Sequence, residues 1–360
     1  MFELIRKWYE RHFSDPQAVM MAWLILVVLG LVWLVGGILA PVLTAVVAAY
    51  LLEGVVTMMN RYHIPRGVAA TIVLIVFIVF VLLLLFGLLP MLSRQVSQLV
   101  FELPRMLGKG QQLLMLLPEQ YPQLFTEAQV IQVSNSIREQ VVDWGQSLLS
   151  MSLANVVNIL AFSVYAVLVP LMVFFTLKDK PAILHWFSHF VPPNNDLSNR
   201  VWAEVDIKIA NYIRGKFIEI LIVGFVSYIT FALMGLNYAL LLGFLVGVSV
   251  IVPFIGAVAV TVPVALIGFF QWGLEPTLGY LMLAYLVIQI LDGNVLVPIL
   301  FSEVVNLHPL AIIVAVLFFG GIWGILGVFF AIPLATFVQA ILNSWPSIHH
   351  YQNNMLNQEE

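Results

Sequence analysis

The chain lacks cysteine altogether and has few charged residues. Without cysteine it can form neither a disulfide framework nor a thiolate metal site. Charged residues make up 9% of the sequence and hydrophobic residues 62%, whereas an average soluble domain has about 25% and about 45–50%, respectively. This composition excludes a soluble globular protein.

Basic residues are also missing from the whole C-terminal part of the chain. All 15 lysines and arginines lie at or before Lys216, and none lies in residues 217–360. A nucleic-acid-binding protein needs clustered basic side chains to contact phosphates, so we expect no nucleic-acid partner. The absence instead predicts that this part of the chain is deeply embedded in a membrane.

Signatures of common enzymes are absent as well. There is no His-Glu-x-x-His metal motif and no Gly-x-Ser-x-Gly nucleophile turn. The segment Gly108-Lys109-Gly110 lacks the spaced glycine and the following Ser or Thr of a phosphate-binding loop. We therefore predict that the chain is not an enzyme and uses no metal or other cofactor.

What the sequence does contain is a series of apolar runs of about 20 residues, the length that a helix needs to cross a hydrocarbon core of ~30 Å. A helix satisfies its own backbone hydrogen bonds there. The runs do not alternate apolar and polar residues as the strands of a membrane barrel do. We therefore predict an all-α polytopic membrane protein.

The first apolar run, residues 19–52, is too long for one crossing and is interrupted by Gly36, Gly37 and Pro41. We predict a helical hairpin that turns at the glycines, preceded by an interfacial amphipathic helix. Basic residues flank this run on both sides, and basic residues favour the cytoplasmic side of a membrane. Both ends of the hairpin are therefore predicted to be cytoplasmic, and a third segment follows at residues 68–91.

The next two connecting segments differ in charge. Residues 92–150 carry four basic and five acidic residues, whereas residues 178–216 carry six basic residues. This difference places the first segment outside and the second inside, joined by a span at residues 153–177. Apolar residues three and four apart predict that the outer segment is an extramembrane helical hairpin, kinked at Pro104. Its helices either pack only on each other or also form contacts between subunits.

A second amphipathic stretch lies in the inner segment. Apolar residues recur at every fourth position from Leu197 to Ile213, opposite Glu204, Asp206 and Lys208. This pattern predicts a helix on the cytoplasmic membrane surface, acting as an elbow before the next span at residues 217–234.

An internal repeat occupies the C-terminal part of the chain. Residues 237–263 and 307–333 have related ends, and the two stretches are offset by 70 residues. Glycines and prolines interrupt both, as in the discontinuous helices that form transporter binding sites. The glycines could instead only permit close helix packing, and both explanations can hold together. The candidate residues for substrate or ion binding in this part of the chain are Pro253, Gly256, Pro263, Asn294, Pro298, His308, Pro309, Gly320, Gly321, Gly324, Gly327 and Pro333.

Asp292 is the acidic residue that lies deepest in an apolar run, residues 278–301. A carboxylate at the bilayer centre costs on the order of 2.5–3.5 kcal/mol, so it normally faces a cavity, a partner or an ion path. Because no basic residue is near it in sequence, Asp292 is predicted to exchange protons or to bind a cation. The structural alternative is a protonated Asp292 that is hydrogen-bonded to Asn294 or to a carbonyl group.

The remaining acidic residues have simpler interpretations. Glu219 is interpreted as an interfacial neighbour of Arg214 and Lys216. Glu53 is interpreted as a charge at a helix end, and Glu303 is expected at a turn.

Motifs along nearly the whole chain combine into a family signature. They are Leu291-Asp292-Gly293-Asn294-Val295-Leu296-Val297-Pro298, Asn306-Leu307-His308-Pro309-Leu310, Ile332-Pro333-Leu334, Pro253-Phe254-Ile255-Gly256, Asn211-Tyr212-Ile213-Arg214-Gly215-Lys216 and Phe174-Phe175-Thr176-Leu177-Lys178-Asp179-Lys180. In combination they resemble the autoinducer-2 exporter family of bacterial membrane proteins. Within that family, the chain is most similar to the PerM-like permease branch.

The resemblance implies an inner-membrane transport protein with about eight transmembrane or re-entrant helical segments and cytoplasmic termini. It also implies a homo-oligomer, for which it suggests a pentamer. Some members of the family are associated with export of the signal autoinducer-2 and others with exchange of sodium or lithium for protons, so the resemblance does not fix the substrate. The expected partners are the lipid bilayer, a small solute or ion, and further copies of the chain.

Together these inferences divide the chain into five parts. They are an N-terminal interfacial helix with the first three membrane segments (1–92), an extracytoplasmic helical hairpin (93–150), a span with a cytoplasmic elbow (151–216), a C-terminal membrane domain with two interrupted repeats (217–345) and a cytoplasmic tail (346–360). The favoured function is a secondary transporter or permease that exports a small solute or ion, coupled to protons or sodium through Asp292. The alternative is a channel-like or scaffolding oligomer without coupled transport.

Overall fold

The computed structural model describes residues 16–120, 126, 128–132, 134–136, 139–140, 143, 159–189, 196–253, 255–301 and 307–344 of the chain. Every regular element in these residues is a helix, which confirms the predicted all-α class. Five of the helices are long and apolar enough to cross a membrane. The described chain therefore has the build of a multi-pass membrane protein.

Helix α2 (Pro16–Arg61) is a single helix of 46 residues. The predicted hairpin is therefore wrong, because the helix continues through Gly36, Gly37 and Pro41. Glycine and proline are tolerated inside membrane helices, where neighbouring groups and local adjustments satisfy the freed backbone atoms. At 1.5 Å per residue α2 is roughly 70 Å long, more than twice the thickness of the hydrocarbon core.

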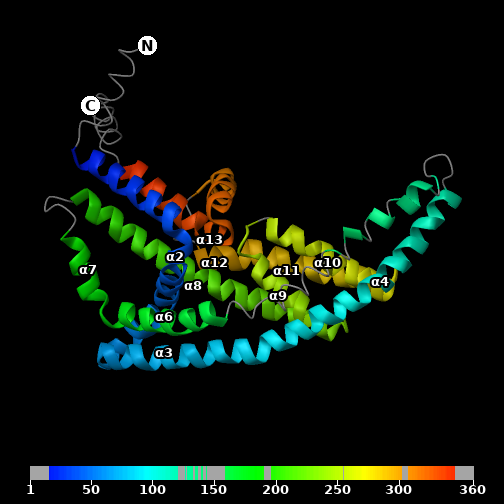
Figure 1. The fold of residues 1–360 in the computed structure, drawn as a ribbon, viewed down its shortest axis with the longest axis horizontal. Coiled ribbons are helices and arrows are strands. Elements are labelled where there is room, and N and C mark those ends of the chain that lie inside the picture. The colour runs from blue at the N-terminus through cyan, green and yellow to red at the C-terminus, as the bar shows by residue number, and fades with distance from the viewer. Residues whose placement is uncertain are drawn as a thin grey trace, which may run out of the picture.

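Helix α3 (Arg66–Leu83), the π-helical turn η1 (Leu84–Leu88) and helix α4 (Leu89–Gln120) follow one another without a break. They form one long arched rod that extends well beyond the rest of the molecule (Figure 1). The predicted third membrane segment thus continues directly into α4, called here the arm, whose extramembrane position stays a prediction.

The arm continues through Pro104 and Pro118 as one helix. A new helix starts after Thr126, whose backbone N–H donates to Gln129 Oε1 (3.1 Å) while the Gln129 N–H donates to Thr126 Oγ1 (3.4 Å). This reciprocal pair is a capping box, which marks a helix N-terminus. It lies where the returning helix of the predicted hairpin should begin, although most of that helix lies outside the described residues. Contacts of the arm between subunits stay a prediction.

Helix α6 (Ile159–Lys178) corresponds to the predicted span at residues 153–177, and the short helix α7 (Lys180–Ser188) follows it. Helix α8 (Asp196–Leu233) is continuous, so the predicted separate elbow on the membrane surface is wrong. Its N-terminal half contacts α2 and the C-terminal helix α13 (Pro309–Ser344). On the described part of its apolar face, Ile209 packs against the core formed with these helices and Ile213 is only 2% exposed.

The first sequence repeat forms a hairpin of helices α9 (Ala239–Ser249) and α10 (Ile255–Trp272), called here the first hairpin. Helix α9 has 11 residues and rises about 16 Å, so it is too short to cross the hydrocarbon core. The second repeat lies in α13, which bends at Gly324 (φ 59°, ψ −137°). Its two apolar arms, Pro309–Gly324 and Leu326–Gln339, are called here the second hairpin. Both repeats are thus interrupted, as predicted.

A glycine closes the turn of each hairpin against a backbone carbonyl. A Cβ atom added at Gly256 would lie 1.8 Å from the Ser249 carbonyl oxygen, and one added at Gly327 would lie 1.9 Å from the Phe319 carbonyl oxygen. No larger residue fits at either position without movement of the backbone. Close packing therefore explains these two glycines, at the points where the helices are interrupted. A role of the interruptions in binding a solute or ion stays a prediction.

Helix α11 (Pro276–Leu291), the π-helical turn η3 (Asp292–Leu296) and helix α12 (Val297–Phe301) form another continuous rod. π-Helical turns inside α-helices are rare and are frequent at functional sites. Here the turn begins at Asp292, the residue predicted to couple ion movement.

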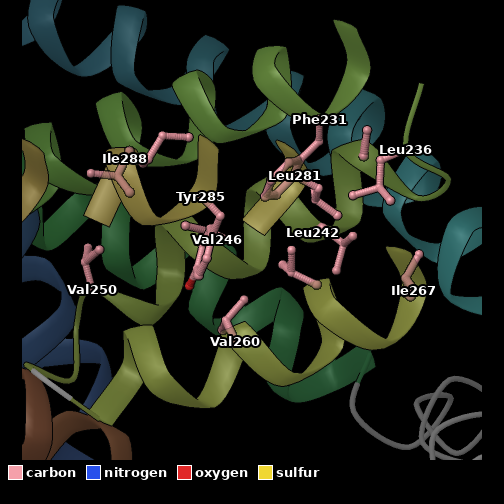
Figure 2. Close-up of a cluster of buried hydrophobic side chains, with 13 residues drawn as sticks. Phe231, Leu236, Leu242, Val246, Val250, Val260, Ile267, Leu281, Tyr285 and Ile288 are labelled. Atoms are coloured by element: carbon pink, nitrogen blue, oxygen red, sulfur yellow. The ribbon is translucent and has the colours of Figure 1, made fainter. Parts of the chain in front are cut away.

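Three apolar cores hold these helices together. One lies between α2, α3 and α6, and a second joins α8, α12 and both arms of α13. The third lies between α8, the first hairpin and α11 (Figure 2). Helix α8 contributes to two of the cores, so it forms the centre of the C-terminal part. The buried residues of the third core are Val223, Phe231, Leu236, Ala239, Leu242, Val246, Val250, Val260, Val264, Ile267, Leu281, Tyr285 and Ile288.

Candidate functional site

Lys216, the last basic residue of the chain, is buried in α8 with 4% exposure. Its ammonium donates a hydrogen bond to the Val250 carbonyl oxygen (2.9 Å) and lies 2.7 Å from Glu219 Oε2. It also lies 5.3 Å from the centre of the Phe301 ring, close enough for a cation–π interaction. Lys216 therefore links α8 to the end of α9 and to α12.

Glu219 lies three residues after Lys216 on the same helix and is 2% exposed. The carboxylate of Glu219 forms a close, buried ion pair with the Lys216 ammonium. The predicted proximity of Glu219 to Lys216 is confirmed, but Glu219 is buried within the protein and not solvated as a surface charge would be. Burial of such a pair costs several kcal/mol per ion, which is offset only in part by their attraction.

Asp292 is half-buried at the start of η3, and its Oδ1 atom is buried without a hydrogen-bond partner. Its carboxylate interacts electrostatically with both Lys216 and Glu219. The Asn294 side chain donates instead to the Ile290 carbonyl oxygen (2.9 Å) and is exposed. The part of the structural alternative in which Asn294 hydrogen-bonds to Asp292 is therefore wrong, whereas a hydrogen bond from a protonated Asp292 to a carbonyl group stays a prediction.

Tyr212 adds a fourth polar group from one turn earlier on α8. It is 1% exposed, and its hydroxyl has no hydrogen-bond partner. The ring packs on Phe301 (5.7 Å between centres) and Phe329 (6.0 Å), and the hydroxyl interacts electrostatically with Glu219. A buried hydroxyl without a partner is energetically costly.

The charges of this cluster do not balance. Glu219 and Asp292 each contribute one negative charge when ionised, and Lys216 contributes one positive charge. One further positive charge, a proton or a monovalent cation, would neutralise the site. Among the described residues no three His, Asp or Glu side chains are grouped so as to hold a metal ion. Any cation bound here would therefore also need backbone and hydroxyl oxygens.

The other predicted residues lie at the turns and ends of the hairpins. Pro253 lies in the turn of the first hairpin and Pro263 lies inside α10. Pro298 is exposed on α12. The Leu310 N–H donates to His308 Nδ1 (3.2 Å), so His308 caps the start of α13.

Pro309 begins α13, and Pro333 lies inside it. Gly320 and Gly321 precede the bend of the second hairpin at Gly324, and Gly327 follows it. Roles for these residues in binding a solute or ion stay predictions.

Sequence reasoning named Lys216 as a neighbour of Glu219 but did not predict that the two form a buried ion pair. The available signal was their spacing, because residues three apart share one face of a helix and opposite charges there attract. Both also stand at the start of a long apolar run without further basic residues.

Glu53 was also misread, since it is not a charge at a helix end but the centre of an ion-pair group. Arg66 Nη2 lies 2.8 Å and 2.9 Å from its two carboxylate oxygens, and Lys180 Nζ lies 3.8 Å away. Arg66 Nε also donates to the Leu177 carbonyl oxygen (2.8 Å). This group ties α2, α3, α6 and α7 together and is distinct from the Lys216 cluster.

Comparison with known proteins agrees with the motif-based resemblance. The family described as "AI-2E family transporter" matches residues 21–347. The chain is 44% identical over 346 residues to PerM of Escherichia coli (strain K12), a protein named as a proposed permease, with 96% of this chain and 98% of PerM covered. It is 23% identical over 325 residues to the AI-2 transport protein TqsA of the same organism, with 90% of each chain covered. The chain therefore belongs to the AI-2E transporter family of multi-pass membrane proteins.

Proposed function

We propose that this chain is a secondary transporter that exports a small solute or ion across the bacterial inner membrane, driven by protons or sodium. The observation that carries the proposal is the Asp292 carboxylate, whose buried Oδ1 atom lacks a partner beside the Lys216–Glu219 pair. Ionisable residues within membrane helices are rare and mark ion paths or proton relays. Asp292 is the residue proposed to take up and release the coupling ion.

The position of the cluster supports this role. The Val250 carbonyl that accepts from Lys216 stands at the C-terminal end of α9, next to the turn of the first hairpin. In secondary transporters, interrupted helices of paired repeats supply such carbonyls and helix ends to ions near the bilayer midplane. The two interrupted repeats and the π-helical turn at Asp292 combine these features in one region.

The names of the relatives agree with transport but name different roles. TqsA is named for AI-2 transport and PerM as a proposed permease. The 44% identity to PerM makes a permease role the better guide to this chain than AI-2 transport, and we propose no particular solute.

The test has two stages. Metabolites and ions accumulated by cells with and without the chain are compared first, which identifies the transported solute. Purified protein is then reconstituted into vesicles, and uptake of that solute is recorded under separate proton and sodium gradients. The variants compared are Asp292→Asn and the control Glu275→Gln, which makes the same charge change at the exposed N-terminal cap of α11.

Gradient-driven flux should fall by at least about tenfold in Asp292→Asn, equivalent to ~1.4 kcal/mol, and should persist in Glu275→Gln. Ion-coupled flux that survives in Asp292→Asn would reject Asp292 as the coupling residue. A conductance that does not depend on a gradient, or no flux at all, would instead support a channel-like or scaffolding oligomer.

A further inference from the structure

The rod of α3 and α4 and the rod of α11 and α12 each contain one π-helical turn. In the first rod the Leu89 N–H donates to the Leu84 carbonyl oxygen, and in the second the Val297 N–H donates to the Asp292 carbonyl oxygen. These partners are five residues apart, whereas an α-helix pairs residues four apart, so each turn is wider than the helix around it. The residues of both turns are described in full, and none of them is buried.

The sequence explains why the turns form where they do. A proline lies two residues after each turn, Pro90 in the first rod and Pro298 in the second. Inside an α-helix the proline ring clashes with the carbonyl group four residues earlier and offers it no N–H donor. Four residues before the two prolines lie Phe86 and Asn294, which are the third residues of the two turns. A wider turn at this carbonyl relieves the clash.

Each turn also contains a glycine that packing does not require. A Cβ atom added at Gly87 or at Gly293 would meet nothing within 4 Å. Gly256 and Gly327 differ, because close contact with a carbonyl group excludes a larger residue there. Glycine inside a helix costs about 0.5–1 kcal/mol relative to alanine, since its backbone leaves the helical conformation more readily. Gly87 and Gly293 therefore weaken the rods at the turns without making a close contact possible.

The second turn, η3, is a joint between two of the apolar cores. Helix α11 is held in the third core by its buried residues, among them Tyr285, whereas α12 is held in the second core by Phe301. Leu296, the last residue of the turn, packs on the third core, and Val297, the first residue of α12, packs on the second. The two ends of the turn are thus held by different groups of residues.

Helix α12 places the Phe301 ring over the Lys216 ammonium, with 5.3 Å between Nζ and the ring centre. Gly215 makes room for the ring, since a Cβ atom there would lie 2.8 Å from it. At 1.5 Å per residue, Phe301 lies about 10 Å along the helix from Asn294. A kink of about 20° at the turn would move the ring by roughly 3–4 Å. Cation–π contacts extend to ~6 Å, so such a movement away from α8 would break this one.

We infer that the π-helical turn η3 is a hinge about which α12 swings away from α8 and takes the Phe301 ring off Lys216. The inference concerns a movement within the chain and goes beyond the proposed function, because it holds whichever solute or ion is carried. The hinge begins at Asp292. A movement of α12 therefore also changes the surroundings of the carboxylate that we propose as the coupling group.

The bend costs little because the turn has already lost what makes a helix stiff. Pro298 supplies no N–H, so bending breaks one hydrogen bond fewer, and Gly293 tolerates many backbone conformations. The Asn294 side chain holds the observed state, since it donates to the Ile290 carbonyl oxygen four residues earlier (2.9 Å). The swung state is expected in about 1–10% of molecules, within the range typical of minor conformations.

The test follows the Phe301 ring by ¹⁹F NMR. 4-Fluorophenylalanine replaces Phe301 alone, in the full chain reconstituted in lipid nanodiscs. Saturation transfer should reveal a second resonance with a population of about 1–10%. The same label in place of Phe231, which packs on Tyr285 of α11 with 6.3 Å between ring centres, reports the fixed side of the hinge and should show one resonance.

Two variants should stiffen the turn without disturbing the fold. Gly293→Ala should lower the population of the second resonance about fivefold, the equivalent of ~1 kcal/mol in helix propensity. Its control is Gly279→Ala, in α11, where an added Cβ atom also meets nothing within 4 Å. Pro298→Ala, at an exposed position, restores a hydrogen-bond donor and should have a similar effect, whereas Pro170→Ala inside α6 should have none. Thermal unfolding should show Gly293→Ala and Pro298→Ala to be at least as stable as the wild type.

The outcomes separate the hinge from the proposed function. A single Phe301 resonance without saturation transfer in the wild type would overturn the hinge, even if coupled flux is found and the proposed function stands. Equal populations in Gly293→Ala and Gly279→Ala, or the same second resonance at Phe231, would also overturn it, since the movement would then arise elsewhere. A second Phe301 resonance that responds to Gly293→Ala, in a chain without coupled flux, would count against the proposed function alone.

Discussion

Replacing Gly256 by alanine should force open the turn of the first hairpin. The new Cβ atom would lie 1.8 Å from the Ser249 carbonyl oxygen and 2.6 Å from its carbon, whereas real Cβ contacts essentially never fall below 3.0 Å. The backbone must therefore separate by roughly 1 Å or more, because a close-packed interior has no free space to absorb the methyl group. Ser249 immediately precedes Val250, whose carbonyl binds Lys216.

We expect Gly256→Ala to lower the free energy of unfolding by about 1–3 kcal/mol, the usual range for overpacking. Up to ~1 kcal/mol of this loss should be offset, because alanine has a higher helix propensity than glycine. The larger consequence should be functional. A shift of this size at Ser249 would displace the Val250 carbonyl from its 2.9 Å hydrogen bond with Lys216. Gradient-driven flux should then fall by about tenfold or more, since a misplacement of ~1 Å at a reacting group can cost about a hundredfold.

The assay pairs thermal unfolding in detergent with flux in vesicles, and Gly279→Ala is the matched control. Gly279 lies in α11, and a Cβ atom there would meet nothing within 4 Å. That variant should keep full flux and be equally stable or slightly more stable. If Gly256→Ala matched it in both measurements, the close approach of Gly256 to Ser249 would not constrain the hairpin, and the link between the turn and the Lys216 site would be refuted.

Two further predictions concern the supports of the fold. Arg66→Met removes a partner of Glu53 and the hydrogen bond to the Leu177 carbonyl, and should lower the free energy of unfolding by about 2–4 kcal/mol, measured by thermal unfolding. The control Arg61→Met, at an exposed arginine at the end of α2, should change it by no more than about 0.5 kcal/mol. Equal effects of the two variants would show that the Glu53 group contributes no stability. Gln95→Ala removes the side-chain oxygen that accepts from the Leu241 N–H (2.8 Å) in the first turn of α9. It should lower the free energy of unfolding by about 1 kcal/mol and speed hydrogen exchange in that turn. The control Gln98→Ala, at an exposed position of α4, should change neither quantity.

Much of the architecture could be predicted because it depends on local sequence. Apolar runs predicted helices, and the repeat with its glycines predicted two interrupted segments around 253–256 and 320–327. Asp292 was identified from its isolation in an apolar run, and the structure places it at a π-helical turn. Each of these features is set by residues that are close together in the chain.

Some predictions were wrong because glycine is a weak signal for a turn inside a membrane helix, and others because contacts between segments far apart in the chain decide the structure. Gly36 and Gly37 predicted a turn, but a membrane helix tolerates glycine when its other backbone bonds are kept, so α2 continues. The apolar face between Leu197 and Ile213 matched a surface helix, and only the approach of α2 and α13 shows that its end at Ile213 is buried. Lys216 could not be placed from its own neighbourhood, because its partners Val250 and Phe301 lie far along the chain.

The two hairpins share a backbone device but differ in chemistry. Each closes a glycine against a carbonyl, with 1.8 Å at Gly256 and 1.9 Å at Gly327 for an added Cβ atom. At the first hairpin the next carbonyl bonds to a charged lysine, whereas at the second Phe319 stacks on Trp323 with ring centres 5.8 Å apart. Aromatic stacking depends little on charge, whereas the ammonium–carbonyl bond at the first turn is charge-assisted and therefore stronger than a neutral hydrogen bond. The two repeats thus share one backbone geometry, but a buried charge holds the first turn and aromatic packing holds the second.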